Sequence, residues 1–217
     1  MGTMKHDSVV QIAEAQLVSG LLASDAIVRE RVVGICGIPS DAIDLQCVPL
    51  VDVPAPPDNN GDVDILLFTP KCPDRVTAVE AKRVVIPSTA IRNGVAYKLE
   101  ELKKGVKQAN KLARIGFHQV YLYIFVVVDS REQNAGTNSL AGAPREIDGQ
   151  VESEISKRLH ELEPRVGLYA CHLIQPVDSE PFYEDSFLGR LHRPASPVQQ
   201  PTALTDWVDR QCRRHVG

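Results

Sequence analysis

The sequence predicts an α/β protein in which helices flank a mixed central sheet. Three strand-like runs, rich in β-branched residues, follow one another at residues 45–53, 62–68 and 76–84, close enough to pair as an antiparallel meander. A long amphipathic helix then precedes a nearly unbroken apolar run at residues 118–128, which is typical of a strand buried on both faces. Because a helical crossover joins strands in parallel, this fourth strand makes the sheet mixed.

Two helices are expected before the first strand, at residues 7–23 and 24–34. In the first of them apolar residues recur at helical spacing, and Asp7 or Ser8 can cap its start. Residues 54–61 are rich in proline and asparagine, so we expect a turn or loop between the first two strands.

The longest helix is expected at residues 95–115. Gly116 follows it directly and is a natural stop, because glycine readily adopts the left-handed conformation that ends many helices. A continuous apolar seam predicts that one face of this helix packs on the sheet. The seam consists of Val95, Leu99, Leu102, Val106, Ala109 and Ala113.

The chain beyond the fourth strand is expected to add one more helix and one more strand. The polar residues 130–149 predict a long loop, and residues 147–162 and 166–174 have the patterns of a helix and a strand. The tail from residue 176 onward is rich in proline and predicts only a short helix at residues 204–212.

The 217 residues suit one domain of ordinary size, spanning residues 1–217. Its expected parts are an αβββαβ core at about residues 8–128 and a C-terminal helix–strand extension at about residues 130–217. A content of 43% hydrophobic and 24% charged residues indicates a folded globular protein rather than a disordered one.

Composition also restricts the environment and the partners. The five cysteines are dispersed without CxxC spacing, which favours reduced thiols in the cytoplasm over disulfides or structural zinc. No apolar run reaches the roughly 18–20 residues of a membrane span, and no secretion signal is recognised, so no membrane partner is expected. The formal net charge of −4 does not by itself indicate nucleic-acid binding, so any such surface must be local.

Charged residues stand inside two of the predicted strands. Since side chains alternate between the faces of a strand, Asp62 and Asp64 share one face, and Glu80 and Lys82 share a face of the next strand. If the two strands form a hairpin, these groups converge. Two carboxylates beside an ammonium are expensive to bury unless they hold a metal ion or one another.

This combination resembles the PD-(D/E)XK nuclease superfamily. Its members share a restriction-endonuclease-like αβββαβ core with an aspartate on the second core strand and Glu/Asp-X-Lys on the third. The matching residues here are Asp64, within Val63-Asp64-Ile65, and the run Glu80-Ala81-Lys82. The resemblance covers about residues 8–128, and Val63 replaces the proline that names the motif.

The resemblance implies a metal-dependent nuclease that hydrolyses phosphodiester bonds, with DNA a more expected substrate than RNA. Restriction, defence or repair would all suit such an enzyme. The expected cofactor is Mg²⁺, with Mn²⁺ able to substitute, held by Asp64, Glu80 and, by similarity to the superfamily, the main-chain carbonyl of Ala81. Lys82 is expected to orient the attacking water and to offset developing charge. Whether Asp62 or Asp64 is the primary ligand stays open.

The two helices add weaker candidates. Glu14 on the first helix corresponds to an acid that many superfamily members direct toward the metal, but it also suits a solvated helix face. Gln108 on the long helix resembles an active-site glutamine of some members, although it lies away from the apolar seam. The same helix carries a basic run that could contact phosphates or simply face solvent. The run comprises Lys103, Lys104, Lys107 and Lys111.

Two other functions remain possible from the sequence. A catalytically inactive protein could keep the nuclease fold and bind nucleic acid or another protein. Alternatively, Glu80 and Lys82 could form an ordinary surface pair worth about 0.5 kcal/mol in a module without a site. A homodimer or a partner protein could supply specificity, since the chain has no recognisable module that reads DNA sequence.

Overall fold

The computed structural model describes most of the chain between Ala13 and Val216. The described ranges are residues 13–23, 26–34, 36–39, 42–50, 53–54, 61–87, 99–129, 145–175 and 187–216. Its elements are α1 (Glu14–Ala23), α2 (Ala26–Gly34), β1 (Ile43–Pro49), β2 (Asp62–Thr69), β3 (Cys72–Ile86), α4 (Glu101–Ile115), β4 (Gln119–Asp129), α5 (Arg145–Glu161), β5 (Gly167–Gln175), β6 (Phe187–Arg193) and α6 (Thr202–Val216).

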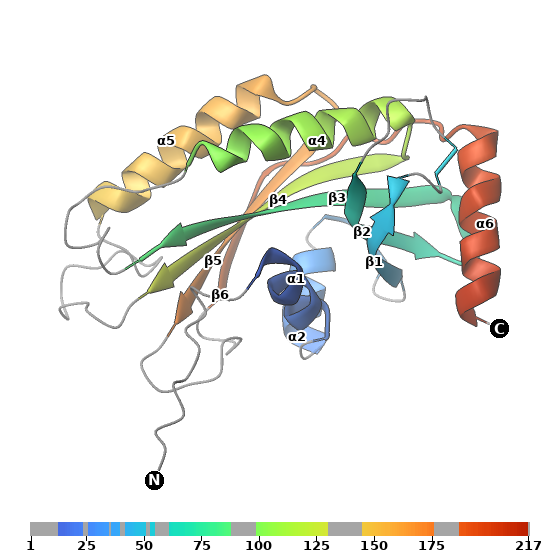
Figure 1. Ribbon diagram of the computed structural model, residues 1–217, viewed down its shortest axis with the longest axis horizontal. Coiled ribbons are helices and arrows are strands. Elements are labelled where there is room, and N and C mark those ends of the chain that lie inside the picture. Colours follow the sequence, from blue (N-terminus) through green and yellow to red (C-terminus); the bar gives the residue numbers. More distant parts are fainter. Residues whose placement is uncertain are drawn as a thin grey trace, which may run out of the picture.

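The strands form one six-stranded mixed sheet, in which they lie side by side in chain order (Figure 1). β1, β2 and β3 pair antiparallel, as the meander prediction requires. β4 pairs in parallel with β3 and with β5, and β6 returns antiparallel to β5. The prediction of an α/β protein with a mixed sheet is therefore confirmed.

Helices cover both faces of this sheet, and β4 shows how the two cores are divided. Its side chains alternate, with Leu122 and Ile124 packing into the core under α4, α5 and α6, and Tyr123 and Phe125 into the core that α1 and α2 cover. All residues from Val120 to Val128 are buried, as the apolar run predicted. Figure 1 shows α4 and α5 on one side of the sheet and α1 and α2 on the other.

The seam of the long helix is also found where it was predicted. Leu102, Val106, Ala109 and Ala113 are buried, and Gly116 ends the helix in the left-handed conformation with φ 100°. The helix begins at Glu101, whereas the prediction placed its start at residue 95; residues 95–98 lie outside the described part of the chain.

Several predicted boundaries need correction. The first strand was expected to run to residue 53, but β1 ends at Pro49 because the chain turns at Leu50. The third strand, expected at residues 76–84, is longer, since Cys72 pairs with Thr69 across the hairpin turn and Ile86 still pairs with β4. The helix expected at residues 147–162 begins two residues earlier, at Arg145, which was expected in the loop. Residues 130–144 are outside the described ranges, as are residues 7–12 of the first predicted helix.

The C-terminal extension contains more secondary structure than the predicted helix and strand. β6 was missed because it is a short edge strand whose described side chains are half-buried or exposed, so the apolar alternation is weak. The helix predicted at residues 204–212 extends over Thr202–Val216, because polar, exposed residues in its second half break the apolar periodicity without breaking the helix. Among the described residues, no helix combines the length and apolar character that crossing a membrane requires.

Two tyrosine hydroxyls attach α2 to the sheet. Tyr123 Oη donates to the carbonyl oxygen of Val32 at 2.7 Å and lies 3.0 Å from Cys36 Sγ, and Tyr121 Oη donates to the carbonyl oxygen of Cys36 at 3.1 Å. Val32 lies in the last turn of α2, where the carbonyls have no partner within the helix, and Cys36 lies just beyond its end. The two bonds thus satisfy carbonyl groups that would otherwise be buried unpaired.

We expect Tyr123→Phe to destabilise the fold by about 1–2 kcal/mol, because it leaves the buried Val32 carbonyl without its donor. The matched control is Tyr169→Phe, since the buried Tyr169 hydroxyl has no hydrogen-bond partner among the described residues. That change should be neutral or stabilising. Urea unfolding of both variants measures the difference, and equal losses would contradict the role given to Tyr123.

Candidate active site

The predicted site lies where β2 and β3 stop pairing. The last paired residues are Ile65 and Val79, while β3 continues beside β4 to Ile86. Past this point the oxygens of two carboxylates accept hydrogen bonds from backbone N–H groups of β3, as a neighbouring strand would. Asp64 Oδ2 accepts from the backbone N–H of Ala81 at 2.7 Å. In the same way, Glu14 Oε2 accepts from the backbone N–H of Arg83 at 2.7 Å.

Lys82 occupies the centre of this arrangement. Its ammonium donates to the carbonyl oxygen of Ala81 at 2.7 Å and to Glu14 Oε1 at 3.2 Å. The same Nζ lies 2.5 Å from Glu80 Oε1 and 4.0 Å from Asp64 Oδ2. Three carboxylates from α1, β2 and β3 thus surround one ammonium, and we call these four residues the Lys82 cluster.

Glu80 is the most buried member of the Lys82 cluster, with 1% of its surface exposed. Its Oε1 forms an ion pair with the ammonium of Lys82. Burial raises the pKa of Glu80 to about 8, and the charge of Asp64 adds to the rise while Lys82 opposes it. Glu80 is therefore mostly protonated at neutral pH in the absence of a further cation.

The same surroundings also shift the pKa values of Asp64 and Lys82. Burial raises the pKa of Asp64, and the Ala81 N–H and the Lys82 charge only partly offset that effect. For Lys82 burial alone lowers the pKa, but the attraction of Glu80, Glu14 and Asp64 outweighs burial and the net pKa is raised. The lysine therefore stays charged over the physiological range.

The oxygen atoms of this cluster fit a hard divalent cation. Mg²⁺ prefers oxygen ligands and needs only one or two carboxylates, and Asp64, Glu80 and the Ala81 carbonyl supply that kind of donor. The excess of carboxyl groups over ammonium groups favours an additional positive charge. Within the described ranges, however, no set of three or more His, Cys, Asp or Glu residues is arranged to hold a metal ion.

The two aspartates of β2 are placed differently. Asp64 is partly buried, bonds to β3 and faces Lys82. Asp62 is exposed at the start of the strand, where it pairs with Pro49 of β1. The register thus brings Asp64 into the Lys82 cluster and leaves Asp62 at its margin, a distinction that alternation alone could not make.

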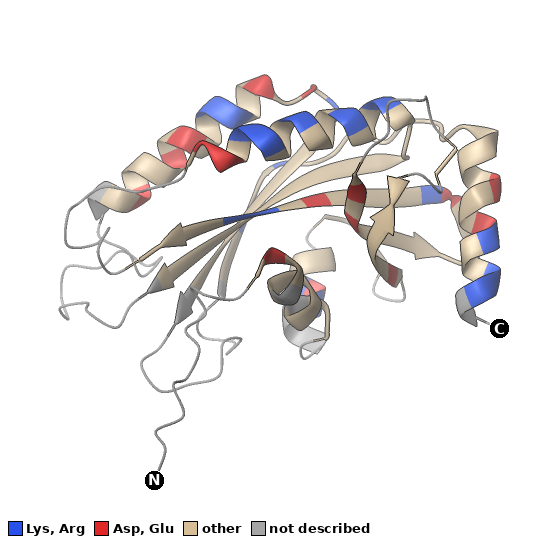
Figure 2. Ribbon diagram, in the orientation of Figure 1, with Lys and Arg blue, Asp and Glu red and all other residues tan. Residues whose placement is uncertain are grey.

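The remaining predicted residues lie on α4. Gln108 is half-buried, and no hydrogen bond in the described structure joins it to the Lys82 cluster. Basic residues recur along the length of this helix (Figure 2). Lys103 forms an ion pair with Glu100, and Lys104 with Glu101 at 2.8 Å, so the basic run is partly neutralised. Lys107 is exposed and Lys111 is half-buried.

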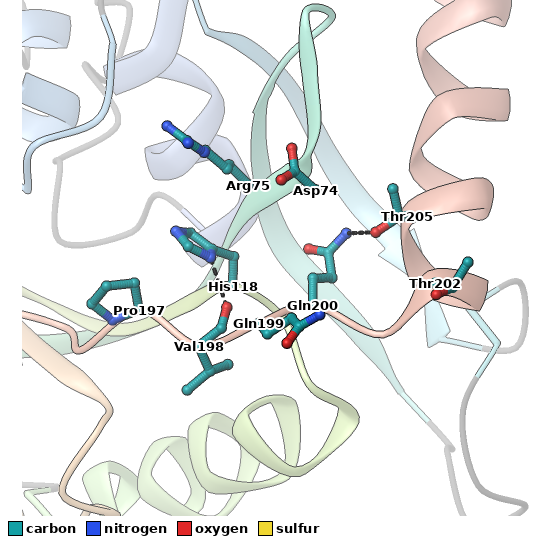
Figure 3. A pocket seen from close by; sticks show the side chains of 9 residues that line it. All are labelled: Asp74, Arg75, His118, Pro197, Val198, Gln199, Gln200, Thr202 and Thr205. Carbon is teal, nitrogen blue, oxygen red and sulfur yellow. Dashed lines mark hydrogen bonds between the residues drawn. The ribbon is translucent and has the colours of Figure 1, made fainter.

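A separate polar cavity of about 550 Å³ opens at the starts of β3 and β4 (Figure 3). No member of the Lys82 cluster lines it. Its buried Gln200 bonds to Pro73 O and to Thr205, and the His118 ring bonds to Val198 O at 2.7 Å. These contacts join α6 and the segment before it to the sheet, so the polar groups of the cavity serve the fold.

No family model, curated protein or solved structure matches this chain. Support for a function therefore comes from the geometry and chemistry of the Lys82 cluster.

In the presence of a chelator, we expect the free energy of unfolding to fall as the pH rises from about 5 to about 8. Over that window Glu80 keeps its proton in the folded protein, with a pKa of about 8, but loses it in the unfolded chain near its ordinary value of 4.5. The folded state then binds more protons, so raising the pH favours unfolding, by at most about 1.4 kcal/mol per pH unit.

Glu80→Gln cannot ionise and should remove most of this slope, while Asp62→Asn serves as the control on an exposed carboxylate. Urea unfolding at a series of pH values measures both. Identical slopes in the wild type and in Glu80→Gln would contradict the assignment of a raised pKa to Glu80.

Proposed function

We propose that this chain is a divalent-metal-dependent nuclease of the PD-(D/E)XK type that hydrolyses phosphodiester bonds in DNA. The observation that carries the proposal is the meeting of Asp64, Glu80, the Ala81 carbonyl and Lys82 at the point where β2 leaves β3. The order of α1, β1, β2, β3, α4 and β4 also supports it, because it follows the αβββαβ core of that superfamily.

In this proposal Asp64, Glu80 and the Ala81 carbonyl oxygen would hold Mg²⁺ or Mn²⁺. A bound divalent ion supplies a more acidic water and offsets charge on the phosphoryl oxygens. The composition of the cluster supports the choice, since three carboxyl groups surround a single ammonium. Because Glu80 is protonated near neutral pH without a further cation, cation binding would release its proton.

Lys82 is proposed to act at the reacting phosphate. Its raised pKa keeps the ammonium charged, so it can donate a hydrogen bond to the attacking water and offset charge that develops on the phosphoryl oxygens. Glu14 holds the lysine from α1 through the 3.2 Å contact with Nζ, while its second oxygen is bound to the backbone of Arg83. Glu14 would therefore orient Lys82 rather than react.

The exposed basic residues of α4 would supply part of the affinity for the DNA backbone. Contacts between lysine and phosphate release counterions, so they strengthen binding without reading sequence. Lys107 is the clearest candidate because it is exposed, whereas Lys103 and Lys104 are held by acidic neighbours one turn away. Gln108 is given no role in this proposal, because no hydrogen bond in the described structure joins it to the Lys82 cluster.

A binding protein without cleavage activity is the second candidate. Its support is that the Lys82 ammonium already contacts Glu80 Oε1 and the Ala81 carbonyl, two of the oxygens that would hold the metal ion. If that ammonium cannot be displaced, the cluster is a stable ion-paired core feature. Metal binding by calorimetry separates the two candidates, because a binding protein of this kind would take up no divalent ion.

We expect the wild type to nick supercoiled plasmid in Mg²⁺ or Mn²⁺ and to lose all activity in a chelator. Asp64→Asn, Glu80→Gln and Lys82→Ala should each lower the rate by at least about 100-fold, the usual effect of removing a group that stabilises the transition state. Asp62→Asn is the matched control and should keep most of the wild-type rate. Equal activity in all variants would point to a contaminating nuclease and contradict the proposal.

DNA binding in a chelator should weaken as salt increases, with a slope set by the number of phosphate contacts. Lys107→Ala should lower the slope of log K against log salt concentration by about 1, the value for losing one phosphate contact. Lys71→Ala, in the turn between β2 and β3, is the control and should leave the slope unchanged. Fluorescence anisotropy of labelled duplexes measures both, and an unchanged slope in Lys107→Ala would exclude Lys107 as a phosphate contact.

A further inference from the structure

We infer that Gly105 of α4 is the positioning residue for Lys82, because a side chain at this position would displace the lysine from the carboxylates. The expected effect on DNA cleavage rests on the proposed function, whereas the expected effect on the position of Lys82 does not. Gly105 stands in the interior of α4, is buried, and packs against the stem of Lys82.

The backbone of Gly105 does not explain why glycine occurs here. A glycine in a helix interior is less favourable than alanine, because glycine loses more backbone conformational entropy when the chain folds. The left-handed conformation explains Gly116, with φ 100°, but Gly105 is an ordinary helical residue. The neighbours of Gly105 must therefore explain why glycine occurs at this position.

A Cβ atom at position 105 would lie 2.5 Å from Lys82 Cγ and 3.3 Å from Lys82 Cδ. The first distance is far below ordinary van der Waals contact. The clash is with the stem of the lysine rather than with its free end, so rotation of the terminal bonds does not relieve it. A second neighbour, Leu122 Cδ1, would lie at 3.0 Å, a contact that a small adjustment of the leucine could relieve.

The stem of Lys82 cannot move without cost because its end is tethered. Nζ is held by the Ala81 carbonyl at 2.7 Å and by Glu14 at 3.2 Å, and it lies 2.5 Å from Glu80. Displacing the stem would pull the ammonium away from these groups and break its contacts with all of them. The absence of a side chain at Gly105 therefore leaves the space that the stem of Lys82 occupies.

Gly149 provides a matched comparison. It lies inside α5, and nothing is within 4 Å of the position its Cβ would take. Gly149→Ala should therefore raise the midpoint of urea unfolding, as expected when alanine replaces glycine on an open helix face. Gly105→Ala should lower that midpoint, although both changes improve the intrinsic helix propensity.

A double-mutant cycle tests the cause. In the Lys82→Ala background the clash is gone, so we expect Gly105→Ala to leave the unfolding midpoint unchanged or to raise it. If Gly105→Ala lowers the midpoint as much in that background as in the wild type, contact with Leu122 explains the glycine and the inference is overturned. If the single variant does not fold, recovery of folding in the double variant supports the inference, and failure to recover overturns it.

Cleavage kinetics give a readout that a purely structural role would not move. Gly105→Ala should lower kcat on the order of 100-fold, as small misplacements of catalytic groups do, with KM for plasmid unchanged, while Gly149→Ala keeps both values. An unchanged kcat in folded Gly105→Ala would overturn the positioning role. If the cycle shows coupling but the wild type never cleaves DNA, the placement of Lys82 by Gly105 stands and the proposed nuclease activity fails.

Discussion

The charge of Lys82 is the interaction on which the arrangement of this end of the sheet depends. Three carboxyl groups approach one another from α1, β2 and β3, and those that are ionised would repel one another in partly buried surroundings without a cation between them. The ammonium makes their approach possible and links α1 to the sheet. Removing one partner from such a buried group leaves an uncompensated charge, which destabilises a protein far more than replacing the whole group by apolar residues.

The divergence of β2 from β3 depends on the same residues. A strand edge that loses its neighbour exposes N–H groups that need acceptors. Here Asp64 and Glu14 accept from the backbone of Ala81 and Arg83, so two of the carboxylates around Lys82 also complete the hydrogen bonding of β3. The opening between the strands is thus stabilised by the residues that line it, and the backbone and the charged groups of the site cannot be changed independently.

How much of this could be read from the sequence differs from residue to residue. Strand alternation placed Glu80 beside Lys82, and the apolar run of β4 and the stop at Gly116 were equally direct, because these are local patterns. The contact of Glu14 with Lys82 and the place of Gly105 beside the lysine stem depend on tertiary packing across distant segments, which no local pattern carries. β6 was missed for a related reason. It forms by pairing with β5, and its own half-buried or exposed side chains show no clear strand pattern.

Three unfavourable features of the structure meet at Lys82. Glu80 is a buried acid with a raised pKa, Gly105 is a glycine inside a helix, and β3 gives up strand pairing for bonds to carboxylates. Each alone has a structural explanation, and ion-paired cores do occur in proteins without sites. Chance would scatter such features over the fold, whereas here all three contact or adjoin one lysine side chain. Proteins tend to keep groups with perturbed protonation and poor local stability where chemistry requires them, so this coincidence favours a working site over a core ion pair.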